Sequence, residues 1–172
     1  MVRPILRYGA PMLHDVAAPV APAAVTGPAT TALIHDLIET LRDAKGVGLA
    51  APQVGVGQRI CIVDVSGGQN PSDLLVLVNP TFEAREGLQL ELEGCLSLPG
   101  FEATVPRPLR VRVRHLDRDG RERTIEGEGL LARAIQHEVD HLDGVLFIDR
   151  LQSISRRLIL RKIRQRRARG TW

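Results

Sequence analysis

The chain has 172 residues, of which 44% are hydrophobic, and no apolar run approaches the ~18 residues that a membrane span needs. This length suits one domain with a core of its own and excludes a membrane-spanning protein. The net charge of +3 is unevenly placed, because residues 1–149 hold 14 basic and 20 acidic side chains, whereas residues 150–172 hold nine basic side chains and no acidic one.

The charge asymmetry predicts a mildly acidic domain over residues 1–150 and a strongly basic tail over residues 151–172. The first residues lack the long apolar stretch of a signal peptide, and the chain has only two cysteines. Both features favour a reducing compartment, so the expected location is the cytoplasm. Cys61 stands in an apolar, strand-like run, which predicts plain packing in the core.

Prolines and alanines are frequent in the first thirty residues, which predicts an extended segment wrapped around the domain. Apolar residues recur at helical spacing from 31 to 44 and predict a first helix. Thr30 or Thr31 is the expected N-cap, and Gly46 is expected at the end of the helix. The glycine-rich residues 46–55 are then a loop that leaves this helix.

Short apolar runs bounded by turn residues predict strands in the middle of the chain. They cover residues 59–65, 74–78, 81–92, 110–115 and 121–126. Val111, Val113 and His115 alternate with arginines, so one face of that strand is expected to be exposed to solvent. The sequence Asp-Arg-Asp-Gly at 117–120 predicts a hairpin turn into the last strand.

A second helix is predicted over residues 130–142, with Gly144 as its stop. The strands and this helix together indicate an α+β fold, in which mixed or antiparallel strands pack around one central helix. An N-terminal helix and a basic C-terminal helix complete the predicted architecture.

The second helix contains a His-Glu-x-x-His pattern, formed by His137, Glu138 and His141. Four residues make slightly more than one helical turn, so the two imidazoles lie on one face and can bind one metal ion. Glu138 can then take a proton from a water molecule on that ion. The pattern therefore predicts metal-assisted hydrolysis.

Such a metal normally has three protein ligands and one open position. No histidine follows His141, and the remaining carboxylates, Asp143 and Asp149, lie too near the end of the helix. The better candidate is upstream, where Cys95 stands in the sequence Glu-Gly-Cys-Leu-Ser. A cysteine binds as thiolate, a soft ligand that suits zinc or ferrous iron.

Three separated motifs now stand in order: Gly-Val-Gly-Leu-Ala-Ala-Pro-Gln at 46–53, Glu-Gly-Cys-Leu-Ser at 93–97, and Gln-His-Glu-Val-Asp-His at 136–141. Together they resemble the motifs of the peptide deformylases, and the resemblance runs from about Arg3 to about Asp149. That family removes the formyl group from the N-terminal methionine of newly synthesised polypeptides and releases formate. The expected substrates are therefore N-formylmethionyl nascent peptides.

The resemblance implies a role for each motif residue. Cys95, His137 and His141 hold the metal, and Glu138 acts as base and then as acid. The Gln53 amide and the Leu96 backbone N–H stabilise the oxyanion. Ferrous iron is the metal that the family commonly uses, and zinc, nickel or cobalt can occupy the same ligands.

The resemblance also implies where the substrate binds. Val47, Gly48 and Gly94 line a groove for the extended peptide backbone. The methionine pocket is expected to be apolar, with Val47 and Leu130 among its walls. Neither DNA nor a membrane is an expected partner.

Two other classes of protein remain open. The helical motif alone would also allow a metallopeptidase, which Cys95 speaks against. The basic tail would allow a protein that binds ribosomal RNA and has a dead enzyme site, but Glu138 and all three ligands are present. An enzyme acting on nascent chains can also bind the ribosome, so the tail is expected to bind ribosomal RNA.

Two finer expectations concern the cleft and the tail. Lys45 and Glu102 flank the first two motifs and are expected to form an ion pair across the cleft. The tail is expected to be a helix whose apolar stripe docks its first turns on the domain, with the last residues frayed. That stripe consists of Leu151, Ile154, Leu158, Ile159 and Ile163.

Overall fold

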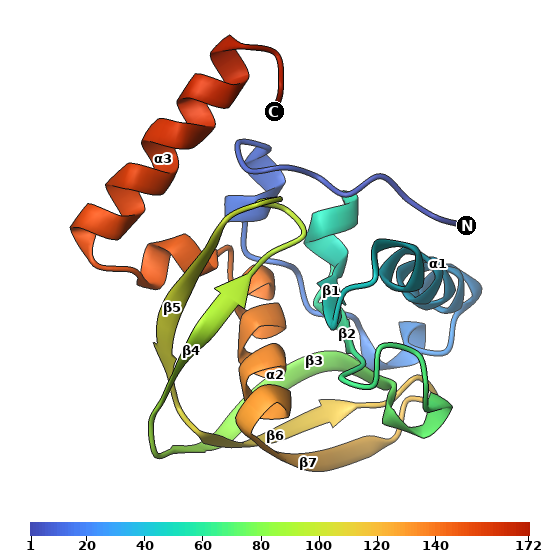
Figure 1. Cartoon of the computed structure of the whole chain (residues 1–172). Coiled ribbons are helices and arrows are strands. Elements are labelled where there is room, and N and C mark those ends of the chain that lie inside the picture. Colours follow the sequence, from blue (N-terminus) through green and yellow to red (C-terminus); the bar gives the residue numbers. More distant parts are fainter.

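The computed structural model describes residues 1–172, and two antiparallel sheets surround one central helix (Figure 1). The helices are α1 (Pro28–Ala44), α2 (Gly129–Leu142) and α3 (Ser153–Ala168). The strands are β1 (Gly48–Ala50), β2 (Ile60–Val63), β3 (Leu75–Glu86), β4 (Gln89–Gly94), β5 (Glu102–Arg107), β6 (Arg110–Leu116) and β7 (Glu122–Glu128). This confirms the α+β fold with a central helix, α2. None of the helices is long and apolar enough to cross a membrane.

The larger sheet has the strand order β1-β2-β3-β6-β7, and the smaller sheet pairs β4 with β5. Every pairing within the two sheets is antiparallel. On β6, Val111, Val113 and His115 are buried and the intervening arginines are exposed, which confirms the predicted alternation. The predicted hairpin at 117–120 connects β6 to β7.

The predicted strand over 81–92 is wrong in its bounds, because two strands from different sheets share that range. β3 continues through Pro80 as far as Glu86, with register shifts on both sides of Thr81. Asn79 has a φ of +52° there, and its side chain bonds both backbone groups of Val20, which stabilises the irregular turn. Gly87, at a φ of +69°, then reverses the chain into β4.

Helix α1 begins three residues before the predicted start. Pro28 occupies its first turn, where the fixed φ of proline suits a helix, and Gly27 is the N-cap, without a side-chain hydrogen bond. Thr30 and Thr31 lie inside the helix, so the predicted threonine cap is wrong. At the other end Lys45 itself takes the left-handed conformation, with a φ of +53°, and the Gly46 N–H donates to the Leu41 carbonyl.

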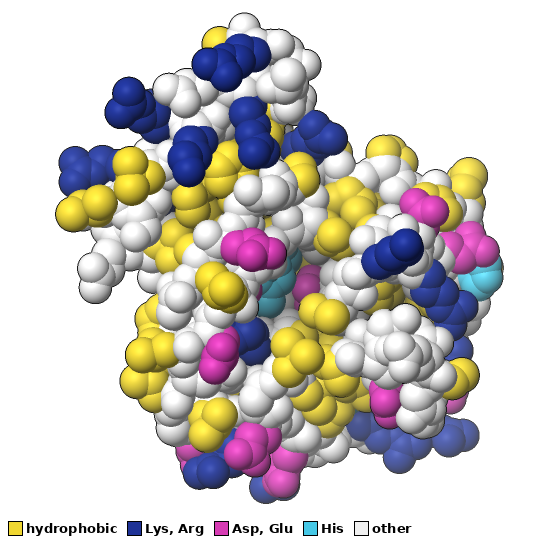
Figure 2. Space-filling model, in the orientation of Figure 1, with side chains coloured by type: hydrophobic (Ala, Val, Ile, Leu, Met, Phe, Trp, Pro, Cys, Tyr) yellow, Lys and Arg dark blue, Asp and Glu magenta, His cyan; other side chains and the backbone are white.

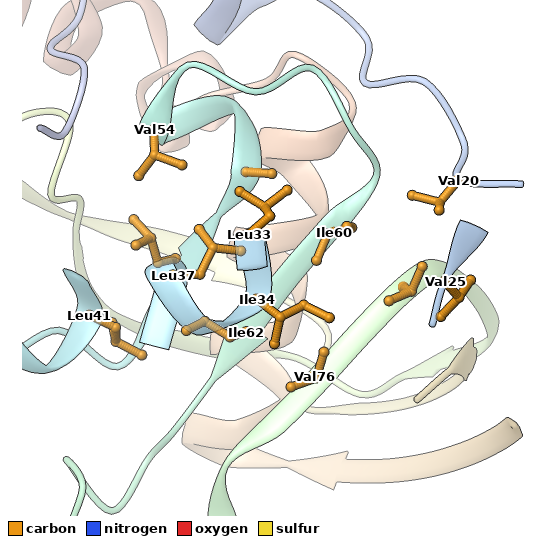
Figure 3. Close-up of a cluster of buried hydrophobic side chains, with 13 residues drawn as sticks. Val20, Val25, Leu33, Ile34, Leu37, Leu41, Val54, Ile60, Ile62 and Val76 are labelled. Atoms are coloured by element: carbon orange, nitrogen blue, oxygen red, sulfur yellow. The ribbon is translucent and has the colours of Figure 1, made fainter. Parts of the chain in front are cut away.

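Three groups of buried side chains form the core. The first lies between α1 and strands β1 to β3 and includes Leu37, Ile60 and Ile62 (Figure 3). The second packs α2 against the larger sheet and contains Cys61, which is free and fully buried, as predicted. The third gathers residues after β4, residues after α2 and one side of α3.

The predicted C-terminal helix is present, but only part of the expected apolar stripe docks on the domain. Ile159 and Ile163 are buried, whereas Ile154 and Leu158 are 66% and 54% exposed. The two pairs lie about 140° apart around the helix, so only one of them can face the domain.

The end of α3 also contacts the domain. Arg166 Nη1 donates to the Pro99 carbonyl at 3.0 Å, and Trp172 Nε1 donates to the Tyr8 carbonyl at 3.2 Å. The expected docking by the first turns alone is therefore wrong. The last turn of α3 is also held against the domain, by the loop after β4 and by the N-terminal segment (Figure 1).

Candidate active site

Three side chains that can bind a metal meet between α2 and the end of β4. His137 and His141 stand one turn apart on α2, and their Nε2 atoms are 3.2 Å apart. Cys95 directly follows β4, and its Sγ lies 3.2 Å from His141 Nε2. The three ligand atoms are within 4.8 Å of one another. A single ion with one sulfur and two imidazole ligands fits this spacing, because metal–ligand bonds of about 2.0–2.3 Å bring ligand atoms to such distances.

The surroundings of these ligands suit a bound cation. The Ser97 backbone N–H donates to Cys95 Sγ at 3.4 Å and so fixes the position of the sulfur. Burial lowers the pKa of His141, so this imidazole is neutral and able to ligate. The donor set therefore fits a transition metal of the zinc or ferrous iron type.

A buried carboxylate sets the orientation of His137. Glu93 Oε1 lies 2.6 Å from His137 Nδ1, which leaves Nε2 directed at the other two ligands. Glu93 also accepts hydrogen bonds from Arg107 Nε at 2.7 Å and from Arg133 Nη1 at 2.8 Å. Burial alone would raise the pKa of Glu93, but the bonds from Arg107 and His137 outweigh it and hold the pKa well below its usual range. Glu93 is therefore ionised.

The same network continues along α2. Arg107 Nη1 donates to Asp140 Oδ2 at 2.9 Å, and Arg150 forms a two-point contact with the Asp140 carboxylate. Arg107 thus joins two buried carboxylates, one behind His137 and one in the next turn of α2. The sequence reasoning assigned no role to Glu93, Arg107 or Asp140. Glu93 and Asp140 stand inside the second and third motifs, and this position was the only sign in the sequence that they belong to the site.

Glu138 faces the ligands from inside the protein. Its side chain is buried and its Oε2 atom has no hydrogen-bond partner. Burial raises the pKa of Glu138 to about 7, although the nearby His137 opposes this. Gly48 in β1 lies against this carboxylate, and a Cβ at that position would overlap Glu138 Oε1. The glycine is needed there because any side chain would displace the acid.

Two hydrogen-bond donors also point at this site. Gln53 Oε1 accepts a bond from the Ala50 N–H at 2.9 Å, and this contact turns Nε2 toward Ser97 Oγ at 3.2 Å and Cys95 Sγ at 3.7 Å. The Leu96 backbone N–H has no acceptor within the protein. Both groups can therefore donate to a ligand beside Cys95.

A cavity of about 440 Å³ opens onto these groups. Its walls include the residues predicted to bind the substrate and most of those predicted to bind the metal or to act in catalysis. The latter are Gln53, Cys95, Leu96, His137 and Glu138. The substrate residues on its walls are Val47, Gly48, Gly94 and Leu130. Figure 2 shows histidine and acidic side chains at the bottom of a hollow in this face of the molecule.

The predicted ion pair across the cleft is wrong. Lys45 and Glu102 both line the cavity, but no carboxylate lies within 4.0 Å of the Lys45 ammonium group. Both side chains are exposed, and an exposed pair gains only ~0–1 kcal/mol, which is too little to hold two flexible chains together.

The family of the chain follows from its relatives. The family described as "Polypeptide deformylase" matches residues 2–157. The chain belongs to this family. A peptide deformylase of Acidobacterium capsulatum is 46% identical over 172 residues, which cover 100% of this chain and 99% of that protein. A peptide deformylase of Thermodesulfovibrio yellowstonii is 50% identical over 135 residues, or 78% of this chain and 82% of that protein.

Solved deformylase structures share the whole fold. The crystal structure of a peptide deformylase from Legionella pneumophila has a TM-score of 0.89 at 40% identity and covers 98% of this chain and 99% of that one. The crystal structure of the peptide deformylase from Thermus thermophilus has a TM-score of 0.86 at 42% identity and covers 99% of this chain and 98% of that one. As a deformylase, the chain is a metal-dependent hydrolase that removes the N-formyl group from nascent polypeptides.

Proposed function

We propose that Cys95, His137 and His141 hold the metal of this deformylase, and that the ion is ferrous iron. The observation that carries this proposal is the approach of one sulfur and two imidazole nitrogens to within 4.8 Å of one another at the bottom of the cavity. When bound, such an ion acts as a Lewis acid and lowers the pKa of water toward neutrality. Zinc, nickel and cobalt suit the same ligands, so the identity of the metal is proposed separately from the three residues that bind it.

Glu138 is the general base of the reaction. It takes the proton of the attacking water and later gives it to the amine that leaves. A pKa of about 7 suits both steps, since a catalytic group is most effective near the working pH. Its unpartnered Oε2 is free to receive that proton.

The oxyanion of the tetrahedral intermediate receives hydrogen bonds from Gln53 Nε2 and the Leu96 N–H. Gln53 is held in place by its bond to Ala50, so its amide needs no reorganisation when charge develops. Loss of one such donor typically costs about a hundredfold or more in rate.

The substrate lies extended between Val47–Gly48 and Gly94, with its methionine side chain against Leu130. Gly48 follows directly on the exposed Val47, and Gly94 ends β4, whose outer edge is unpaired. Backbone groups on such an edge can pair with an extended peptide. The formyl group is then placed beside Cys95.

The decisive test compares two peptides that differ only in their first nitrogen. Anaerobically purified protein should release formate from formyl-Met-Ala-Ser and leave unformylated Met-Ala-Ser intact, with about one equivalent of iron per chain by elemental analysis. Cys95→Ala should lose both the metal and formate release. Cleavage of the Met–Ala bond in the unformylated peptide would instead indicate a metallopeptidase.

A second proposed function is binding of ribosomal RNA by α3, which would place the enzyme in the cytoplasm beside emerging nascent chains. Basic side chains gather along this helix (Figure 2). Four basic residues on α3 or at its C-cap are exposed and make neither an ion pair nor a side-chain hydrogen bond: Arg161, Lys162, Arg164 and Arg169. Such a cluster, without any acid in the helix, is the electrostatic footprint of a nucleic-acid binder.

The test of ribosome binding replaces these four residues with glutamine, because a chain ending at Leu151 would also remove Ile159 and Ile163 from the core. Co-sedimentation with ribosomes at low salt should fall about tenfold or more, while short formylated peptides are still turned over. The matched control replaces Arg110, Arg112, Arg114 and Arg123, which are exposed on β6 and β7, and should bind normally. Equal loss in both variants would mean a response to net charge alone.

A further inference from the structure

Strand β4 has an unusual outer face. Leu90 and Leu92 alternate along it, Leu88 directly precedes the strand, and each of the three is at least 60% exposed. On the opposite face, Glu91 is exposed, but Gln89 and Glu93 turn inward, where Gln89 bonds the Gly129 carbonyl and Glu93 bonds His137. Because side chains alternate along a strand, the three leucines share the outer face. We call them the leucine row.

No part of the chain covers the leucine row. The residues of β5 that pair with Leu90 and Leu92 are Pro106 and Thr104, and both are exposed as well. Figure 2 shows hydrophobic side chains over β4 and β5 on the face that also carries the cavity. Three large apolar side chains side by side on an edge strand are a feature that proteins usually avoid unless it serves binding.

The row is continuous with the cavity. Leu92 is itself a wall of the cavity, together with Glu93 and Gly94. The free edge of β4 borders the cavity, because β4 pairs with β5 alone. The leucine row thus begins at the mouth of the site and runs away from it along the strand.

The position of Cys95 sets the direction of a bound peptide. Cys95 follows the last residue of β4, so the formylated end of a substrate lies at the C-terminal end of that strand. A peptide extended along the free edge must therefore run antiparallel to β4, from Gly94 back toward Gln89. Its successive side chains alternate between the inner and the outer face.

This alternation assigns the side chains of the peptide. The methionine side chain enters the cavity on the inner face, so the second residue faces outward. The second residue then lies beside Leu92, and the fourth residue lies beside Leu90, two positions further along both strands. The third residue faces inward and does not reach the row.

On this basis, and resting on the proposed function, we propose that the leucine row makes the enzyme selective for nascent chains with apolar second and fourth residues. Cross-strand pairs of apolar side chains on one face stabilise a strand pairing, and each contributes a factor of about 1.4 to 5 in binding. Two pairs together give a preference of about 2- to 25-fold. The preference acts on peptide binding, because the row lies away from the reacting atoms.

The test measures kcat and KM of formate release for three formylated peptides. One has leucine at positions two and four, one has leucine at position three only, and the reference has serine at all three positions. We expect the first peptide to exceed the reference about 2- to 25-fold in kcat/KM, mainly through KM. The second should equal the reference.

The variant Leu90→Thr/Leu92→Thr keeps a residue type that suits a strand and should reduce this ratio to about one. The control Val16→Thr changes an equally exposed apolar residue away from the site and should keep the ratio. An unchanged ratio in the double variant, or a preference that follows position three, would overturn the proposal. Absence of formate release from every peptide would instead refute the proposed function.

A second copy of the chain is the other candidate occupant of the row, and light scattering at the assay concentration separates the two. We expect a monomer in both the wild type and the double variant. A dimer that dissociates on Leu90→Thr/Leu92→Thr would make the row a subunit interface and would overturn the proposal.

Discussion

Replacing Glu138 with glutamine is expected to leave the metal bound and to remove nearly all formate release. The amide has the shape of the carboxylate but cannot accept the proton of the attacking water. Proton transfer by a positioned side chain contributes about 10²- to 10⁴-fold, and kcat should fall by that factor. The measurement is kcat for a formylated peptide, with metal content determined on the same sample.

An independent variant tests the position of Glu138 rather than its chemistry. In Gly48→Ala the new methyl group would overlap Glu138 Oε1, so the carboxylate must move away from the ligands. Activity should fall while the metal is retained, since Cys95 and both histidines are unchanged. Gly57→Ala is the control, because a Cβ there meets no neighbour. Near wild-type turnover by Glu138→Gln would show that another group is the base.

The chemical groups could be predicted because they lie in short motifs with fixed local geometry. His137 and His141 face the same way in any regular helix. The alternation on β6 likewise predicted which face is buried. In these cases the sequence spacing and the spatial arrangement are linked by the period of one element.

The features that the sequence did not predict depend on contacts between segments that are far apart in the chain. Arg107 meets Glu93 because β4 pairs with β5, and β5 was absent from the prediction since its apolar residues do not form a clear run. Likewise, which side of α3 faces the domain depends on the orientation of the chain after Leu151. The predicted stripe contained residues on two sides of that helix, and only packing distinguishes Ile159 from Leu158.

The leucines of the leucine row also show that one feature can be read from the sequence and another depends on packing. Their alternation with Gln89 and Glu93 is visible in the sequence, but alternation does not reveal which face is covered. The inner face holds the charged residues because Glu93 must reach His137, and this reverses the usual order of apolar side chains inside and polar ones outside. A functional requirement thus explains why residues 81–92 were difficult to predict.

Arg107 is the residue whose loss should most reduce stability. Its side chain is 2% exposed and contacts the carboxylates of Glu93 and Asp140. Removing one partner of a buried ion pair costs about 3–5 kcal/mol when the other charge is left uncompensated. Arg133 still bonds Glu93 and Arg150 still bonds Asp140, so the cost here should lie at the lower end of that range. Arg107→Met should therefore lower the free energy of unfolding by about that amount, a large part of the roughly 5–15 kcal/mol typical of a domain. Urea denaturation at pH 7 measures it.

Arg112→Met is the matched control for this prediction. That arginine lies on β6 with its side chain 53% exposed, and it pairs with Glu83 and Glu126 at the surface. Exposed pairs contribute ~0–1 kcal/mol, so its unfolding free energy should stay within that range of the wild type. Equal effects of the two substitutions would contradict a special role for Arg107.

The effect of Arg107→Met should also depend on pH in a defined direction. Burial raises the pKa of Glu93, but the bonds from Arg107 and His137 outweigh it, so the folded-state pKa lies below the unfolded value of about 4.3. Stability from this ionised carboxylate is present above pH ~4.3 and is lost as the pH falls through the folded-state pKa. Without Arg107 the folded-state pKa of Glu93 should rise, so that Glu93 of the variant takes up a proton below pH ~4 while Glu93 of the wild type stays ionised. The deficit of Arg107→Met should therefore be largest at pH 6–7 and should shrink below pH ~4. A deficit that stays constant from pH 7 to pH 3 would mean that the arginine stabilises the fold through packing of its aliphatic part and not through its charge.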